Sequence, residues 1–184
     1  MNRRKFIEIT GAGAIGLSLL TKCNMDTNIS IWRFLTTEEA KVLEAVCEQI
    51  IPADKDPGAK EAKVVNFIDK QLVKYYKKHQ NTYRTGIAGV EETSKMEYSQ
   101  SFDKLTFEQQ FQIMLSLESG KAKGKIWEQH SSADFFNLVR EHTMQGFYGS
   151  PKHGGNINYL SYKMLGIDSP IIIGQNRCHI NKSI

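Results

Sequence analysis

After residue 35 the apolar and polar residues alternate with a helical period. Thr36 and Glu39 have the spacing of a capping box, the pairing that closes the first turn of a helix. Apolar residues then recur three and four positions apart until Pro52, which cannot continue a helix: Ala40, Leu43, Val46, Cys47, Ile50 and Ile51. The pattern predicts an amphipathic helix that begins after Thr36 and ends before Pro52.

Residues 53–59 contain Pro57-Gly58 and predict a turn. A second helix is expected to follow, with one apolar face formed by Val64, Ile68, Leu72, Tyr75 and Tyr76. Lysines are expected along another face of this helix. The cluster Lys74, Lys77 and Lys78 is interpreted as its solvated side and end.

The pattern is weaker in the middle of the chain. Tyr83, Ile87 and Val90 have helical spacing, but Gly86 and Gly89 interrupt it, and the polar residues 92–100 predict a loop. Thr106 and Gln109 then predict a capped helix that ends at Gly120, with Phe107, Phe111, Met114 and Leu115 as its apolar residues. A further helix is predicted from near Ser132 to Gly146, with an inward face of Phe135, Phe136, Leu138, Val139 and His142.

The chain contains no sustained strand-like alternation and no repeat of fixed period. We therefore predict one irregular all-α domain of four to six helices over residues 31–184, with a glycine-rich C-terminal loop. About 150 residues suffice for a hydrophobic core without help from a cofactor. The aromatic residues at helical spacing are accordingly interpreted as core packing.

Residues 1–30 are predicted to be a targeting signal and a linker. Arg3 and Arg4 are followed by Phe6 and by a stretch rich in glycine and alanine, an order that resembles a twin-arginine signal, which exports folded proteins. The run from residue 9 to residue 21 is shorter than the roughly 20 residues of a membrane-spanning helix. Residues 11–16 match GxGxxG, but no predicted strand precedes them, so a dinucleotide site is not expected there.

The basic character of the chain comes mainly from this signal. Residues 1–23 hold four of the 24 lysines and arginines and one of the 20 acidic residues, which leaves 20 basic against 19 acidic residues in the remainder. Binding to nucleic acid would require a clustered basic face, which this near balance does not provide. No nucleic-acid partner is expected.

The three cysteines suggest different chemistry. Cys23 occupies the place of a lipid-modified cysteine, although Lys22 before it departs from the small residue that such processing favours, so lipidation stays open. Cys47 is expected to be a buried thiol, and a disulfide with Cys178 also stays open. The sequence has no CxxCH motif for haem c and no Cys/His group with zinc-site spacing.

The most unusual segment is residues 146–156, in which four glycines and a proline accompany aromatic side chains. One interpretation is a helix stop and a connector. The other is a partner-binding surface, in which Phe147 and Tyr148 anchor the partner and His153 and Asn156 bond to it. A hidden catalytic pair, such as His153 with Asp54, is a third possibility that depends on the fold.

Several motifs together resemble the small subunit, subunit 3, of membrane-associated gluconate 2-dehydrogenases. The resemblance covers nearly all of the chain after the signal, and the Phe-Tyr-Gly and Gly-Gly-Asn block is its most specific part. The motifs are Leu35-Thr36-Thr37-Glu38-Glu39, Ile50-Ile51-Pro52-Ala53-Asp54, Pro57-Gly58-Ala59, Phe67-Ile68-Asp69, Phe147-Tyr148-Gly149-Ser150-Pro151-Lys152-His153-Gly154-Gly155-Asn156 and Met164-Leu165-Gly166. The tail from residue 171 to residue 184 has no counterpart, and its role stays open.

The resemblance implies a division of labour in a periplasmic complex. A large subunit of the glucose-methanol-choline type would hold FAD and oxidise a sugar or sugar acid, and a cytochrome subunit with haem c would take the electrons where it is present. This chain would hold no cofactor or metal and would bind, stabilise and help to export the large subunit, with Gly149, Pro151, Gly154 and Gly155 shaping its contact loop. Its own attachment to a membrane would come through the complex or through a lipid on Cys23.

Two other functions stay open at this stage. The chain is either a free binding protein of the cell envelope or, less in keeping with its motifs, a small helical enzyme. The substrate of the complex is also open, with gluconate, glucose and 3-oxidised glycosides all compatible with the resemblance.

Overall fold

The computed structural model describes residues 31–166, which contain seven α-helices and no strand. The all-α prediction is confirmed, and the helices exceed the expected four to six because α6 and α8 have only five residues each. The elements are α2 (Thr37–Ile50), α3 (Val64–Leu72), α4 (Gln80–Tyr98), α5 (Phe107–Glu118), α6 (Lys125–Gln129), α7 (Ser132–Tyr148) and α8 (Leu160–Met164). The predictions for Arg3, Arg4, Phe6, Cys23, Cys178 and the tail 171–184 lie outside the described residues.

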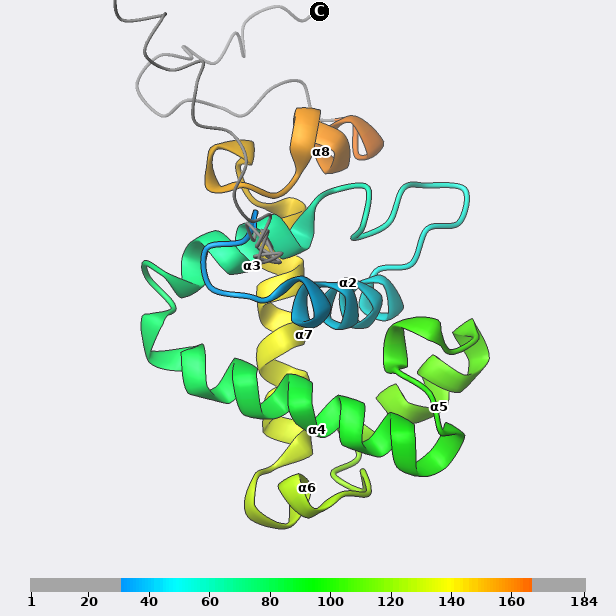
Figure 1. Cartoon of the computed structure of the whole chain (residues 1–184). Helices are drawn as coiled ribbons and strands as arrows, with labels where there is room; N and C mark the ends of the chain where they lie inside the picture. The colour runs from blue at the N-terminus through cyan, green and yellow to red at the C-terminus, as the bar shows by residue number, and fades with distance from the viewer. Residues whose placement is uncertain (1–30, 167–184) are drawn as a thin grey trace, which may run out of the picture.

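Helix α7 is the central element of the fold. It runs through the middle of the molecule in Figure 1, and it contacts α2, α3, α4, α5 and α8. The core forms where these helices meet, and it includes six fully buried side chains from five helices: Leu43, Ile68, Tyr83, Ile113, Val139 and Phe147. No helix in the described part of the chain is long and apolar enough to span a bilayer.

The helix starts follow the capping signals in the sequence. Thr36 accepts a hydrogen bond from the backbone N–H of Glu39 (3.1 Å), and the Glu39 carboxylate accepts one from the backbone N–H of Thr36 (2.8 Å). Thr106 and Gln109 make the same reciprocal pair at the start of α5. These side chains satisfy backbone donors that have no partner inside the helix, so both predicted starts are confirmed.

The prediction of a loop over residues 92–100 is wrong, because α4 continues to Tyr98. The glycines that weakened the pattern have packing roles. A Cβ atom at Gly86 would lie 2.1 Å from the ring of Phe135, and one at Gly89 would lie 2.4 Å from the ring of Trp127. Glycine therefore allows α7 and α6 to pack closely on α4, and this packing offsets its low helix propensity.

The predicted inward face of α5 is also wrong in part. Met114 is buried, but Phe107, Phe111 and Leu115 are exposed. The side chains that point to the core are Gln110, Ile113, Met114 and Leu117. The helix carries apolar residues on two faces, and its contacts with α2 and α7 decide which of them is buried.

The second helix is shorter than expected. Helix α3 ends at Leu72, and Tyr75, which was expected on its buried face, is 78% exposed. Lys77 and Lys78 lie in the 3-10 helix η1 (Lys77–His79), not on the side of one long helix. The three lysines are exposed as predicted, but they lie in the turn after α3 and in η1.

Candidate functional site

The end of α7 and the loop after it are folded back against α3. Gly146 lies inside α7, which continues to Tyr148 and not only to Gly146 as predicted. A Cβ atom at Gly146 would lie 2.9 Å from the ring of Phe67, so this glycine permits a close approach of α3 and α7. Phe147 is fully buried in the core, where it contributes to stability and makes no surface for a partner.

Asn156 holds this loop closed from within. Its backbone has a positive φ of 46°, and its side chain is fully buried. The amide nitrogen donates to the backbone oxygen of Gly149 (2.8 Å), and the amide oxygen accepts from the backbone N–H of Ser161 (2.8 Å). The structure therefore places Asn156 as an internal tie between the end of α7 and the start of α8.

The glycines of the loop are close to other backbone groups. The Gly149 N–H donates to the Gln145 oxygen (2.9 Å) at the end of α7. Gly154 has a positive φ of 111°, and a Cβ atom at Gly155 would lie 2.3 Å from the backbone oxygen of Gly146. Pro151 begins the 3-10 helix η3 (Pro151–His153). These residues give the loop a defined shape and leave Tyr148 and His153 beside open space.

That open space is a groove of about 590 Å³, which we call the aromatic groove. It lies between the end of α3, the end of α7 and η3, and its walls include Phe67, Tyr75, Tyr76, Met144, Tyr148 and His153. Tyr75, Met144 and Tyr148 are 78%, 44% and 39% exposed. The sequence singled out Tyr148, Gly149 and His153, but it gave no signal that Tyr75 and Met144 join them.

A stack of aromatic rings, formed by the half-buried Tyr76 and the buried His142 and Tyr83, fixes the inner wall of the aromatic groove. The rings of Tyr76 and His142 are parallel, with centroids 3.8 Å apart, and the hydroxyl of Tyr83 bonds to Nδ1 of His142 (2.9 Å). The Tyr76 hydroxyl bonds to Gln145, which also lines the groove. Burial, with a smaller contribution from His79, lowers the pKa of His142 to about 4, so its ring is neutral at pH 7.

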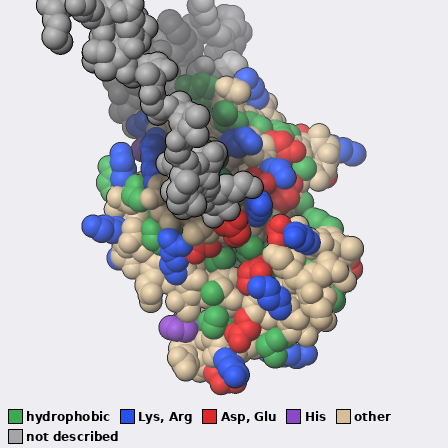
Figure 2. Space-filling view, viewed as in Figure 1, with side chains coloured by type: hydrophobic (Ala, Val, Ile, Leu, Met, Phe, Trp, Pro, Cys, Tyr) green, Lys and Arg blue, Asp and Glu red, His purple; other side chains and the backbone are tan. Residues whose placement is uncertain are grey.

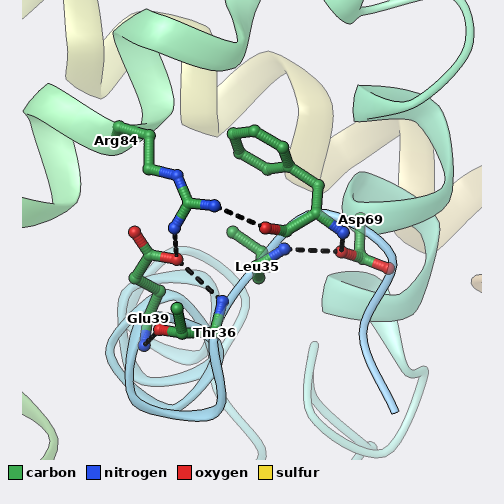
Figure 3. Close-up of polar contacts among 6 residues, drawn as sticks. Leu35, Thr36, Glu39, Asp69 and Arg84 are labelled. Carbon is green, nitrogen blue, oxygen red and sulfur yellow. Dashed lines mark hydrogen bonds and ion pairs between the residues drawn. The ribbon is translucent and has the colours of Figure 1, made fainter. Parts of the chain in front are cut away.

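A polar network ties the segment before α2 to the helices (Figure 3). The Asp69 carboxylate accepts the backbone N–H groups of Arg33 (2.8 Å), Phe34 (2.9 Å) and Leu35 (3.0 Å). The side chain of Asp69 is buried. Three backbone donors satisfy this buried charge, which makes its burial tolerable.

Arg84 of α4 completes the network. Its guanidinium pairs with the Glu39 carboxylate, donates to the Phe34 backbone oxygen (2.7 Å) and lies over the Phe34 ring at 4.4 Å. Residues from α2, α3 and α4 thus hold the first described residues in one place. The partners are 34 to 50 positions apart, so the sequence pattern did not reveal them.

The catalytic alternative gains no support from contacts. Asp54 lies in the exposed turn after α2, where it accepts from the Asp56 N–H (2.9 Å), and no hydrogen bond or ion pair joins it to His153 in residues 31–166. A second groove, of about 390 Å³, brings together His79, His130 and Asp134. Among the described residues, these three share no hydrogen bond, and no group of three or more His, Cys, Asp or Glu could hold a metal ion.

Cys47 is a buried free thiol, as expected. The Thr143 hydroxyl donates to its sulfur (3.3 Å), and burial raises the pKa of the thiol to about 12. The thiolate is the reactive form, so this cysteine is inert at neutral pH. The predicted alternative of a disulfide with Cys178 concerns a residue outside the described part.

Comparison with known proteins gives one finding. The family model for gluconate 2-dehydrogenase subunit 3 matches residues 37–168. Searches of curated proteins and of solved structures found no match. The family match begins at the first residue of α2 and includes the aromatic groove, the Asn156 loop and every described helix. The chain belongs to the gluconate 2-dehydrogenase subunit 3 family.

Proposed function

We propose that this chain is a non-catalytic small subunit that binds, stabilises and helps to export the FAD-containing large subunit of a periplasmic sugar or sugar-acid dehydrogenase. The observation that carries the proposal is the family match over residues 37–168, because this family is named for a subunit of a dehydrogenase complex. The partner would be a large subunit of the glucose-methanol-choline type, with a cytochrome c subunit as a third component.

The aromatic groove is the contact surface that we assign to the partner. Its aromatic residues combine large apolar area with few rotatable bonds, so they lose little conformational entropy on binding. The ring stack behind Tyr76 and the Asn156 tie behind Tyr148 supply a preformed shape. Of the residues expected to bind the partner, Tyr148, Gly149 and His153 line the groove and would make the contact, while Phe147, Pro151, Gly154, Gly155 and Asn156 would support its shape.

The division of cofactors follows from this assignment. FAD would be held by the large subunit and haem c by the cytochrome subunit, and this chain would carry neither. The substrate would be oxidised in the large subunit, so the small subunit would influence turnover only through assembly and location.

The export role rests on the paired arginines. Twin-arginine transport carries folded proteins, and a flavoprotein acquires its FAD before it crosses the membrane, so one signal on the small subunit would serve the whole complex. The complex would then reside in the periplasm, attached to the membrane through its own subunits or through a lipid on Cys23. The Asp69 and Arg84 network would fix the point at which the linker joins the helical domain.

The test is co-expression of the full chain with a flavoprotein large subunit of the glucose-methanol-choline type. We expect both chains in the periplasmic fraction, and the double variant Arg3→Lys with Arg4→Lys should leave both in the cytoplasm. Arg33→Lys is the matched control, because the Arg33 position contributes its backbone N–H to Asp69. Export of the large subunit with the double variant would refute the escort role.

A further inference from the structure

Five lysines lie next to lining residues of the aromatic groove in the chain or in the turn that follows them. Lys70 lies on α3, Lys74 in the turn after it, Lys77 and Lys78 in η1, and Lys152 in η3 on the opposite side. The Lys70 ammonium donates to the backbone oxygen of Lys152 (2.7 Å), so the two sides of the groove meet at this point. In Figure 2, Lys and Arg side chains gather along the edge of the molecule where α3 leads into α4.

The positive charge of these lysines is not neutralised within the described residues. The ion pairs of residues 31–166 are Lys60–Glu44, Arg84–Glu39, Lys95–Glu91, Lys123–Glu97 and Arg140–Glu118, and none includes a lysine of the groove. Two carboxylates are relevant to this charge, Asp69 on α3 and Glu141 on α7. Asp69 is buried against three backbone donors, and the exposed Glu141 accepts from Gln145. Five lysines against two carboxylates give this part of the surface a local positive charge, although the chain after residue 23 as a whole is nearly balanced.

The groove also exposes large apolar side chains. Tyr75 is 78% exposed, and within residues 31–166 it has no hydrogen bond and no ring contact. It lines the groove together with Met144 and Tyr148, and Lys74 precedes it in the chain. Exposed tyrosine and methionine beside a hollow are typical of protein interfaces.

We propose that the aromatic groove and its five lysines bind an acidic segment of the partner protein, in which a large apolar side chain fills the groove and flanking carboxylates face the lysines. The proposal rests on the proposed function, since it assigns this segment to the partner subunit. Charge complementarity at the rim speeds encounter and excludes basic partners, and the apolar anchor supplies most of the affinity. A hollow of this kind suits a protruding side chain, whereas binding to a flat bilayer requires protruding apolar groups on this chain.

The charge is tested with the full-length triple variant Lys74→Glu, Lys77→Glu and Lys78→Glu. Its binding to the purified flavoprotein large subunit is compared with that of the unaltered chain. At low ionic strength we expect the dissociation constant to rise about tenfold, since each exposed charge pair contributes a factor of about two or more. The difference should shrink at high salt, where the charges are screened.

The anchor is tested with Tyr75→Ala. The Tyr75 side chain is mostly exposed and makes no hydrogen bond or ring contact with the other residues of the described part, so this variant should keep its thermal stability. Its dissociation constant should rise about tenfold at low and at high salt alike, because the lost contact is apolar. Controls with matched chemistry lie elsewhere on the exposed surface: Met96→Ala on α4 and the triple variant Lys104→Glu, Lys121→Glu and Lys125→Glu.

The outcomes separate the two proposals. Reduced binding of both groove variants, with unaltered binding of both controls, supports the acidic segment. If the large subunit binds every variant equally, this inference is wrong and the proposed function stands. If the unaltered chain does not bind the large subunit at all, both are wrong. Binding to phosphatidylglycerol vesicles or to single-stranded DNA that is lost in the groove variants, while binding of the large subunit is kept, would assign the surface to another ligand and overturn the inference.

Discussion

Replacing Asn156 with alanine tests whether this residue acts inside the chain or at a partner surface. The substitution removes the donor to the Gly149 oxygen and the acceptor of the Ser161 N–H, both at 2.8 Å. The site is fully buried, so water does not replace these bonds without a rearrangement of the loop. The loss is therefore expected in the free chain, before any partner is added.

The magnitude follows from the two bonds and the backbone. Leaving a buried polar group without a partner costs about 1–3 kcal/mol, and alanine tolerates the positive φ of 46° less well than asparagine. We expect the free energy of unfolding to fall by about 3 kcal/mol. Asn158 provides a matched control, because it also has a positive φ (55°) but is exposed, so Asn158→Ala retains the backbone cost alone.

Urea unfolding followed by circular dichroism measures both variants under the same conditions. The difference between them isolates the two buried hydrogen bonds from the shared backbone effect. If Asn156→Ala and Asn158→Ala unfold at the same urea concentration, the internal tie contributes nothing. That result would favour the expectation from the sequence that Asn156 contacts the partner directly.

Three other changes follow from the contacts. Asp69→Ala leaves three backbone N–H donors without their acceptor and should lower the free energy of unfolding, measured in urea, by about 3 kcal/mol. Replacing the exposed Asp54 with alanine should lower it by less than about 1 kcal/mol. Equal effects of the two variants would contradict the network. Gly86→Ala places a Cβ atom against the Phe135 ring and should lower stability by about 1–3 kcal/mol, so an unchanged melting temperature would contradict the packing. Lowering the pH from 6.5 to about 4 should reduce the free energy of unfolding, because the pKa of His142 is lowered in the fold and the unfolded chain binds the proton more readily. The variant His142→Asn should make this pH dependence weaker. An unchanged pH dependence in the variant would show that other groups cause it.

The sequence predicted what local signals control. The capping boxes at Thr36 and Thr106 act within four residues, so the sequence alone predicts the starts of α2 and α5. Gly86 and Gly89 show the opposite case. Their low helix propensity is a local property, but the rings that require glycine there come from residues about 40 to 50 positions later. The continuous helix α4 was therefore missed.

The candidate site was predicted only in part for the same reason. Tyr148 and His153 belong to a segment whose composition is unusual, so the sequence singled it out. Tyr75 reaches the same groove because α3 ends at Leu72 and the chain turns, and nothing in the apolar pattern marks that end. The roles of Phe147 and Asn156 depend on burial, which a run of aromatic and polar residues near glycines does not specify.

The proposed function requires that this chain binds a flavoprotein and that the oxidation takes place in that partner. The most direct measurement is the flavin absorbance and sugar-dependent dye reduction of the full chain purified alone, beside the same chain purified with the large subunit. We expect bound flavin and turnover in the two-chain sample and neither in the single chain. Flavin bound to the single chain in equal amount, or turnover by it, would contradict the proposal that this chain is a non-catalytic subunit.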